Sequence, residues 1–217
     1  MTITNCVIVG AGGHGREIAE ILQADPRVGF SIKGFIDDDR HLSNQIINGL
    51  PVLGDWSWFE TADRRGLAVI CALGSAEDRR KTATRAAAQN LSFCSAVSPA
   101  ASVSSHVRLG EGVMILPHAV VGPNCIIGDH VIINVGATVS HDSQIARFST
   151  INPGVHIAGN VSIGEGCYVG VGASVIHGIS VGAWSIVGGG AVVTDDLPAN
   201  VTAVGVPAKV IKTHNQR

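Results

Sequence analysis

The sequence predicts two folds in one chain: an α/β domain with a parallel sheet over residues 1–95, followed by a parallel β-helix of hexapeptide repeats over residues 96–217. Two observations lead to this prediction. In the first part, short apolar runs alternate with helical patterns, which is typical of a parallel sheet with helices on its faces. In the second part, aliphatic residues recur at every sixth position, a period that neither an α-helix nor a flat strand produces.

The composition excludes several classes of protein. Charged residues make up 15% of the 217 residues and the formal net charge is −2, which argues against a basic nucleic-acid-binding protein and against a disordered chain. No apolar stretch reaches the length of a transmembrane helix without Gly, Asn or His interrupting it. The N-terminus has no basic region before its apolar run, so we expect a strand there and no signal peptide.

The elements of the first domain follow in order along the chain. The predicted strands span residues 3–9, 30–36, 51–54 and 67–73. The predicted helices span residues 14–24, 56–65 and 77–89, and the first of them shows helical spacing in Ile18, Ile21 and Leu22.

A glycine-rich turn joins the first predicted strand to the first predicted helix. Gly10, Gly12 and Gly15 fit the Rossmann-like pattern G-x-G-x-x-G, in the strand–turn–helix context where a helix N-terminus can bind a pyrophosphate. A dinucleotide-dependent dehydrogenase is nevertheless disfavoured, because no catalytic domain follows, only a coil. In addition, His14 stands where dehydrogenase turns usually carry a small or apolar residue.

The hexapeptide repeats begin at Val97. Stepping by six from Val97 to Val193 passes through seventeen positions, and all of them are Val, Ile or Leu. The positions four residues further on, from Val113 to Ala191, are small or β-branched. Three hexads would complete one triangular coil, so residues 18 apart should stack at the strand spacing of about 4.8 Å. We expect the aliphatic residues to point into the coil and the small residues to fit near its corners.

The five cysteines are expected to be buried free thiols. Their number is odd, no CxxC motif occurs, and all of them lie in apolar runs. This pattern suits a reducing compartment and therefore favours a cytoplasmic location. The five residues are Cys6, Cys71, Cys94, Cys125 and Cys167.

Motifs in both parts of the chain resemble one family. The first part carries GAGGHG at 10–15, GFIDD at 34–38 and ALG at 72–74. The second part carries NVGATVSHD at 134–142, AGNV at 158–161, VGGGAVV at 187–193 and GVPAK at 205–209. In this order and spacing, they resemble the sugar O- and N-acyltransferases of the sialic acid O-acetyltransferase (NeuD) type. That group includes the PglD-like bacterial enzymes that N-acetylate nucleotide-linked 4-amino sugars.

The resemblance covers essentially the whole chain, and it implies a left-handed coil and a homotrimer that binds acetyl-CoA between neighbouring coils. It implies acetyl transfer from acetyl-CoA to the amino group of a nucleotide-linked amino sugar, for bacterial surface glycan synthesis. O-acetylation of sialic acid or of another sugar hydroxyl stays an alternative. Apolar pairs expected on the outer faces, Ala119-Val120 and Val131-Ile132, also favour a trimer.

The resemblance carries two sets of binding residues over to this sequence. The residues implied for the acceptor are Gly12, Gly13, His14, Asp37, Asp38 and Gly74. The residues implied for acetyl-CoA are Thr150, Gly159, Val171 and Gly189. Thr150 departs from the family, which often has a second histidine at that position. No metal is expected.

His141 and Asp142 are the predicted catalytic pair. A general base needs an imidazole that is neutral near pH 7, and a neighbouring carboxylate can fix its tautomer. On an ideal strand the two side chains would point to opposite faces, so their contact requires a turn. The resemblance makes this histidine the base and the next residue its acidic partner. Relatives commonly have Glu there, and the shorter Asp142 could weaken or re-aim the contact.

Two other classes of function stay open. Hexapeptide coils hold zinc between subunits in the γ-class carbonic anhydrases, so a zinc-dependent lyase is an alternative enzyme. However, His106, His118 and His130 are spaced by twelve, which places them on different faces of the coil. The second alternative is a scaffolding trimer that binds a nucleotide sugar without chemistry, and the His141-Asp142 pair argues against it.

Overall fold

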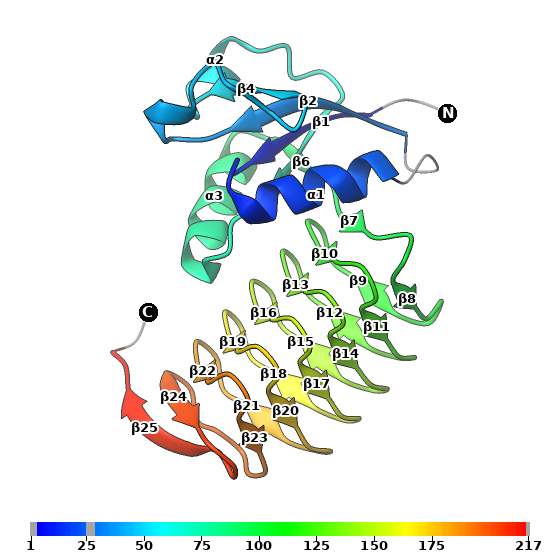
Figure 1. Ribbon diagram of the computed structural model, residues 1–217, viewed down its shortest axis with the longest axis vertical. Helices are drawn as coiled ribbons and strands as arrows, with labels where there is room; N and C mark the ends of the chain where they lie inside the picture. Colours follow the sequence, from blue (N-terminus) through cyan, green and yellow to red (C-terminus); the bar gives the residue numbers. More distant parts are fainter. Residues whose placement is uncertain (1–3, 25–28, 216–217) are drawn as a thin grey trace. The chain divides into compact units, whose positions relative to one another are not determined.

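The computed structural model describes residues 4–24 and 29–215 (Figure 1). The chain divides into two compact units, residues 1–98 and residues 99–217. Residue 3, the first of the first predicted strand, lies outside the described residues. Within the described part of the chain, none of the helices combines the length and the apolarity that crossing a membrane requires.

The first unit is the predicted α/β fold. Its strands are β1 (Thr4–Val9), β2 (Phe30–Ile36), β3 (Ile46–Ile47), β4 (Leu50–Gly54), β5 (Leu67–Cys71), β6 (Ser92–Phe93) and β7 (Ala96–Val97). Its helices are α1 (Gly13–Ala24), the 3₁₀ helix η1 (Arg40–Leu42), α2 (Trp58–Thr61) and α3 (Ala76–Ala88). The sheet order is β3-β4-β2-β1-β5-β6, and every pairing is parallel except the β3–β4 hairpin.

The helix predicted over residues 56–65 is much shorter in the structure, because α2 ends at Thr61. Ala62 is already extended, with ψ of 147°. Asp63 then accepts a hydrogen bond from the backbone N–H of Arg65, at 3.1 Å, and pairs with its guanidinium. A short polar side chain that bonds to its own backbone in this way competes with the helix.

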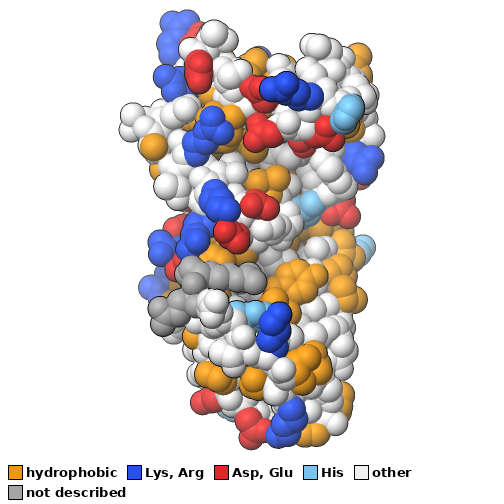
Figure 2. Space-filling model, turned by 90° about the vertical axis from the view of Figure 1, so that its left-hand side faces the viewer, with side chains coloured by type: hydrophobic (Ala, Val, Ile, Leu, Met, Phe, Trp, Pro, Cys, Tyr) orange, Lys and Arg blue, Asp and Glu red, His pale blue; other side chains and the backbone are white. Residues whose placement is uncertain are grey.

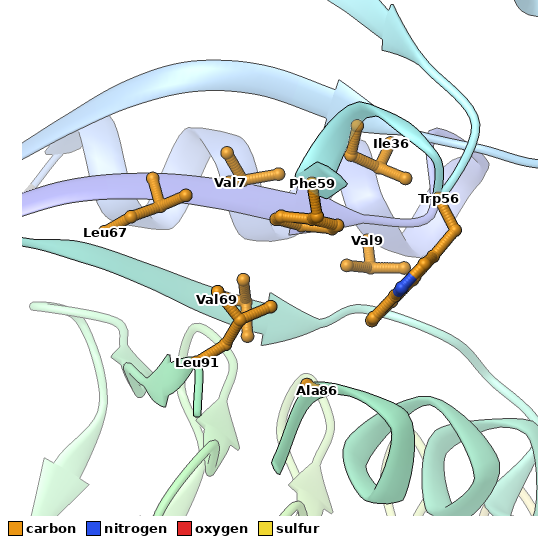
Figure 3. Close-up of a cluster of buried hydrophobic side chains, with 9 residues drawn as sticks. All are labelled: Val7, Val9, Ile36, Trp56, Phe59, Leu67, Val69, Ala86 and Leu91. Carbon is orange, nitrogen blue, oxygen red and sulfur yellow. The ribbon is translucent and has the colours of Figure 1, made fainter. Parts of the chain in front are cut away.

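The core of the first unit is formed by side chains of its central strands, β1 and β5, and by residues of the segments that cover them. Val7 and Val9 of β1 pack with Val69 of β5, and Phe59 and Trp56 cover them (Figure 3). The rings of Trp56 and Phe59 are 4.9 Å apart, centre to centre, in a tilted arrangement. This aromatic pair closes the core beside the ends of β1 and β2.

The second unit is a coil of short strands on three faces, which appear as three stacks of arrows in Figure 1. The first face holds β10 (Met114–Ile115), β13 (Ile132–Ile133), β16 (Thr150–Ile151), β19 (Tyr168–Val169), β22 (Ile186–Val187) and β24 (Val201–Val204). The second face holds β8 (Ser102–Val103), β11 (Val120–Val121), β14 (Thr138–Val139), β17 (His156–Ile157), β20 (Ser174–Val175) and β23 (Val192–Val193). The third face holds β9 (Arg108–Leu109), β12 (Ile126–Ile127), β15 (Gln144–Ile145), β18 (Ser162–Ile163) and β21 (Ser180–Val181). A final strand, β25 (Lys209–Thr213), pairs antiparallel with β24.

The predicted stacking period is confirmed. Residues 18 apart pair in parallel, as Met114 does with Ile132 and Thr138 with His156. Every sixth-position aliphatic from Ile115 to Val193 is at most 2% exposed. Burial of one such side chain contributes about 1.5–3 kcal/mol, so these stacked aliphatic residues together stabilise the coil strongly.

One expectation about the outside of the coil is wrong. Ala119, Val131 and Ile132 were expected on outer faces, but they are 0%, 0% and 1% exposed. Ala119 and Val131 occupy the corner-filling position of their hexads, which points inward. Only Val120 of that set is exposed.

All five cysteines are free and buried, as predicted.

Candidate active site

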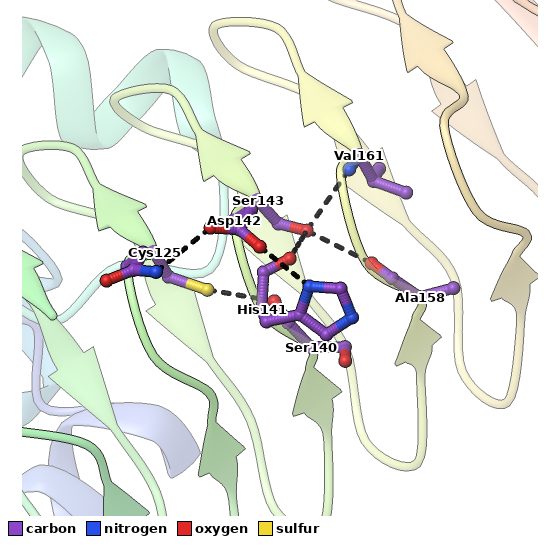
Figure 4. Close-up of polar contacts among 8 residues, drawn as sticks. Cys125, Ser140, His141, Asp142, Ser143, Ala158 and Val161 are labelled. Carbon is purple, nitrogen blue, oxygen red and sulfur yellow. Dashed lines mark hydrogen bonds and ion pairs between the residues drawn. The ribbon is translucent and has the colours of Figure 1, made fainter. Parts of the chain in front are cut away.

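His141 and Asp142 lie in the turn between β14 and β15, at the edge that joins the second and third faces. Nδ1 of His141 is 2.8 Å from Oδ2 of Asp142 (Figure 4). Asp142 has φ of 57°, a left-handed conformation that brings both side chains to one side, as the predicted turn required. The contact favours the tautomer with its proton on Nδ1, which leaves the lone pair on Nε2.

Asp142 is held from two sides. Nδ2 of Asn124 donates to its other oxygen, Oδ1, at 3.0 Å. The hydrogen bond with His141 first, and that with Asn124 second, lower the pKa of Asp142 below its usual 3.8. The carboxylate is therefore ionised at neutral pH, as a partner of an imidazole must be to stabilise the imidazolium.

The backbone of this turn is fixed by neighbours in adjacent coils. Oγ of Ser143 donates to the carbonyl of Ala158 at 3.0 Å, and the thiol of Cys125 donates to the carbonyl of Ser140 at 2.9 Å (Figure 4). Gly159 stacks one coil after His141, and a Cβ there would lie 2.5 Å from Cε1 of the imidazole. The imidazole thus lies over Gly159, and any side chain at that position would displace it.

The other residues implied for acetyl-CoA lie elsewhere on the coil. Val171 and Gly189 stack in turns at the edge between the first and second faces, where the N–H of Gly190 donates to the carbonyl of Val171 at 2.8 Å. Val171 is 57% exposed. Thr150 is on the first face, in register between Ile132 and Tyr168, and is 4% exposed. Within one chain, the structure brings Gly159 to the catalytic pair and leaves these three residues apart from it.

The first unit contains a cavity of about 390 Å³ at the carboxyl ends of β1 and β2. Ligands of α/β folds with parallel sheets bind at this end of the strands. The lining includes Asp37 and Asp38, as the sequence suggested, whereas Gly12, Gly13, His14 and Gly74 do not line it. The lining residues are Val9, Gly10, Ile36, Asp37, Asp38, Trp56, Leu73, Asp78, Lys81, Thr82 and Arg85.

Sequence reasoning missed the wall of the cavity that α3 provides. Asp78, Lys81, Thr82 and Arg85 are three, four and seven residues apart, so they share one face of the helix. This spacing marks one polar face of the helix, but it does not by itself show that the face borders the end of the sheet. The guanidinium of Arg85 lies 4.6 Å from the ring centre of Trp56, a cation–π contact.

The two aspartates shape the mouth of the cavity. Oδ2 of Asp37 accepts from the N–H of Ala11 at 2.8 Å, and Oδ1 accepts from the N–H of Asp39 at 2.9 Å. Asp37 therefore ties the glycine turn to the end of β2. Oδ1 of Asp38 accepts from the N–H of Trp56 at 3.3 Å, and this contact ties the end of β2 to the segment before α2.

The glycines of the turn fall into two groups. Gly10 has φ of 105°, and a Cβ there would lie 2.8 Å from the carbonyl oxygen of Ala72. A Cβ at Gly15 would collide with the carbonyl of Gly10. Gly12 and Gly13, in contrast, have neither a positive φ nor a close neighbour. The fold requires glycine at the first pair, whereas the second pair leaves the backbone of the turn open to a ligand.

His14 and Gly74 lie near a buried arginine. Arg79, 0% exposed, donates to the carbonyls of Leu73 and Gly74 at 2.7 and 2.9 Å, and so fixes the loop after β5. Burial lowers its pKa to about 10, which leaves it charged at neutral pH. Burial also lowers the pKa of His14 from 6.5, against the opposing effect of Glu17, so His14 is neutral at pH 7.

Over residues 4–24 and 29–215, no group of three or more His, Cys, Asp or Glu side chains is placed to hold a metal ion.

Comparisons with known proteins cover both units. The model of the PglD N-terminal domain matches residues 5–86, and that of the bacterial transferase hexapeptide, in six repeats, matches residues 106–141. No curated protein sequence matches the chain.

Solved structures resemble nearly the whole chain. A histidine variant of GDP-perosamine N-acetyltransferase from Caulobacter crescentus, in complex with CoA and GDP-perosamine, is 37% identical, with a TM-score of 0.90 and coverage of 97% of this chain and 98% of its own. The acetyltransferase domain of PglB from Neisseria gonorrhoeae, with acetyl coenzyme A, is 31% identical, with a TM-score of 0.89 and coverage of 97% and 100%. WeeI from Acinetobacter baumannii is 30% identical, with a TM-score of 0.86 and coverage of 97% and 100%.

Proposed function

Because the chain belongs to the PglD-like family of sugar N-acetyltransferases with hexapeptide repeats, we propose that it transfers an acetyl group from acetyl-CoA to the amino group of a nucleotide-linked amino sugar. The observation that carries this proposal is the hydrogen-bonded pair of His141 and Asp142 on the coil. Two relatives support the choice of substrates, since one was solved with CoA and GDP-perosamine and the other with acetyl coenzyme A.

In the proposed mechanism, His141 is the general base. The amine nitrogen of the acceptor attacks the thioester carbonyl, a C–N bond forms, and the proton of the amine passes to Nε2 of His141. Asp142 accepts from Nδ1–H and stabilises the imidazolium that results. The C–S bond then breaks, and the departing thiolate of coenzyme A takes the proton from Nε2, which restores the base.

We assign the nucleotide of the acceptor to the first unit. The cavity of about 390 Å³ there offers the carboxylates of Asp37 and Asp38 to N–H and O–H groups of a base or ribose. Lys81 and Arg85 on α3 supply positive charge to a diphosphate. Gly12 and Gly13 lie at the N-terminus of α1, whose first N–H groups have no acceptor within the helix and attract anions. His14 and Gly74 complete this assignment.

We assign acetyl-CoA to the groove between two coils of a homotrimer. His141 and Gly159 are at one edge of the coil, whereas Val171 and Gly189 are at another, so one ligand would meet both pairs only if a second copy presented its edge. Exposed apolar side chains on the outside of the coil support such packing (Figure 2). They include Val120, Val135, Tyr168, Val171 and Ile176.

The surface formed by Val171 and Gly189 fits the apolar arm of acetyl-CoA. Val171 is exposed, and Gly189, which stacks on it, adds no side chain that would stand in the way. Thr150, being buried, would donate to the acetyl carbonyl only if the neighbouring coil delivered the ligand to the first face. A cytoplasmic location fits the five free thiols.

The test is a panel of GDP-, UDP- and dTDP-linked amino sugars, and free sialic acid, each incubated with acetyl-CoA and the full-length protein. We expect an acetylated product, detected by mass, from at least one of the nucleotide amino sugars. Acetylation of sialic acid alone would replace the amine by a hydroxyl as the acceptor. No product from any acceptor would overturn the proposal.

A further inference from the structure

We propose that Asn124 is a positioning residue for the reaction: it orients Asp142, which in turn fixes the tautomer and direction of the His141 imidazole. The inference rests on the proposed function, in which His141 is the base. Asn124 belongs neither to the predicted catalytic pair nor to any of the predicted binding residues. It lies 18 residues before Asp142, in the corresponding turn of the preceding coil.

The two turns stack directly. The backbone N–H of Asp142 donates to the carbonyl of Pro123 at 3.0 Å. Asn124 has φ of 61° and Asp142 has φ of 57°, so both residues adopt the same left-handed conformation. Two residues with the same backbone conformation in stacked turns direct their side chains the same way, one strand spacing of about 4.8 Å apart. The amide of Asn124 is thereby placed beside the carboxylate of Asp142.

The carboxylate of Asp142 then has one partner for each oxygen. Oδ1 accepts from Nδ2 of Asn124 at 3.0 Å, and Oδ2 is 2.8 Å from Nδ1 of His141. A carboxylate held by one oxygen can rotate about its last torsion angle. Holding both oxygens fixes the plane of the group, and with it the direction of the hydrogen bond to the imidazole.

Such support matters because the catalytic pair is solvent-accessible. The side chains of His141 and Asp142 are 52% and 45% exposed. Exposed ion pairs are weak, since water competes for both partners and both side chains lose rotational freedom on pairing. A second hydrogen bond, from a residue whose backbone belongs to the rigid coil, offsets this weakness. In metal sites, outer partners that orient a ligating histidine in the same way typically change activity by about 10- to 100-fold.

The residue type fits the role. Asparagine tolerates the left-handed conformation better than most residues with a Cβ, and its amide supplies the N–H that an ionised carboxylate needs. An aspartate at this position would tolerate the backbone equally but would set a second negative charge against Asp142. The choice of amide over carboxylate is therefore where the chemistry can be tested.

Two substitutions separate the role of the side chain from that of the backbone. Asn124→Gly removes the amide without strain, because glycine adopts a positive φ freely. Asn124→Asp keeps the size of the side chain and removes the donor. We expect kcat for acetyl transfer to fall by about tenfold in the first variant and further in the second, while the KM of each substrate stays within about twofold. Asn90→Gly is the matched control, with φ of 54° at the end of α3, and its kcat should equal that of the wild type.

Two further measurements exclude a merely structural effect. In the Asp142→Asn background, Asn124→Gly should cause no additional loss of kcat, because Asn124 acts through Asp142. Nitrogen NMR of the His141 imidazole should report the proton on Nδ1 in the wild type and a mixture of tautomers in Asn124→Gly.

The outcomes are distinct. If the wild type acetylates no acceptor, the proposed function fails. If the wild type is active and Asn124→Gly keeps its kcat and its tautomer, or if the losses in the double variant multiply, the role of Asn124 is overturned. Should Asn124→Gly fail to fold, Asn124→Asp carries the test, and an unchanged kcat in that variant refutes the role.

Discussion

In the coil, the residue that supports Asp142 lies 18 positions before it in the sequence, whereas in the α/β unit the residues that line the cavity come from five separate segments. The turns that contain Asn124 and Asp142 stack on each other because both residues have the same left-handed backbone conformation. The cavity instead gathers the ends of β1 and β2, the loop after β5, Trp56 and one face of α3. In a repeat protein, the period alone predicts which residues are in contact. In a parallel sheet with crossover helices, the contacts depend on the strand order, which the sequence does not show directly.

Removal of the proposed base tests whether the chemistry belongs to the coil. His141→Ala should lower kcat by about 10²- to 10⁴-fold, the usual contribution of a positioned base. Because the side chain is half exposed, thermal unfolding should hardly change. Product formation with the preferred acceptor, measured by mass spectrometry, gives kcat; turnover near that of the wild type would move the base elsewhere.

Asp142→Asn should have a smaller effect, about 10- to 100-fold in kcat. The substitution removes the charge that stabilises the imidazolium but leaves the imidazole in place. The kcat of Asp142→Asn is compared with that of His141→Ala under identical conditions. Equal losses of kcat in the two variants would contradict a supporting role for Asp142.

A substitution in the glycine turn tests whether the acceptor binds to the α/β unit. Gly13→Val should raise the KM of the acceptor by about tenfold through steric exclusion of the diphosphate, with the KM of acetyl-CoA unchanged. Folding should be retained, since Gly13 has no positive φ and no close neighbour. Gly15→Ala is the opposite control: its Cβ would collide with the carbonyl of Gly10, and unfolding should become easier by about 1–3 kcal/mol. A rise in the KM of acetyl-CoA in Gly13→Val would reverse the assignment of the two ligands.

Arg85→Ala should raise the KM of the acceptor by a smaller factor, about three- to tenfold. The change removes one positive charge from the cavity wall and the cation–π contact with Trp56. Arg80→Ala is the matched control, on the same helix but outside the cavity lining. Equal KM values for the two variants, from steady-state kinetics, would place the acceptor elsewhere.

The stability of the α/β unit should depend weakly on pH through His14. The pKa of His14 is lowered from 6.5 by burial, so the unfolded chain binds a proton before the folded chain does. The stability that neutral His14 allows is complete above pH 6.5 and declines as the pH falls below it, towards the lowered folded pKa. Thermal unfolding between pH 8 and pH 5 should therefore show a shallower decline for His14→Gln than for the wild type. Parallel curves would contradict the assignment.

The resemblance implied the left-handedness of the β-helix, whereas the fold class followed from the sequence pattern, and the family match supports both. The sequence pattern was sufficient because each hexad contains an aliphatic residue for the interior of the coil and a small residue for its corner. The resemblance identified His141 and Asp142, and their contact depended on the turn that follows β14. The support from Asn124 could have been predicted too, since it requires only a count of 18 residues back from Asp142.

The cavity wall formed by α3 was harder to predict. Lys81 and Arg85 have the spacing of an ordinary solvent-exposed helix face, and only the strand order shows that this face borders the end of the sheet. The length of α2 was also missed, because the side chain of Asp63 binds the backbone of Arg65 and overrides the helical pattern. Local competition of this kind leaves little trace in the spacing of apolar residues.

The reactivity of the buried thiols can report on the unfolding of each unit. Burial raises the pKa of Cys71 to about 12 and that of Cys167 to about 11, so these thiols stay protonated and shielded from alkylating reagents at pH 8. Each becomes reactive only when its surroundings open. Cys6, Cys71 and Cys94 report on the α/β unit, and Cys125 and Cys167 report on the coil. Timed labelling followed by peptide mass analysis would therefore show, in one experiment, which unit opens first and whether the two open together.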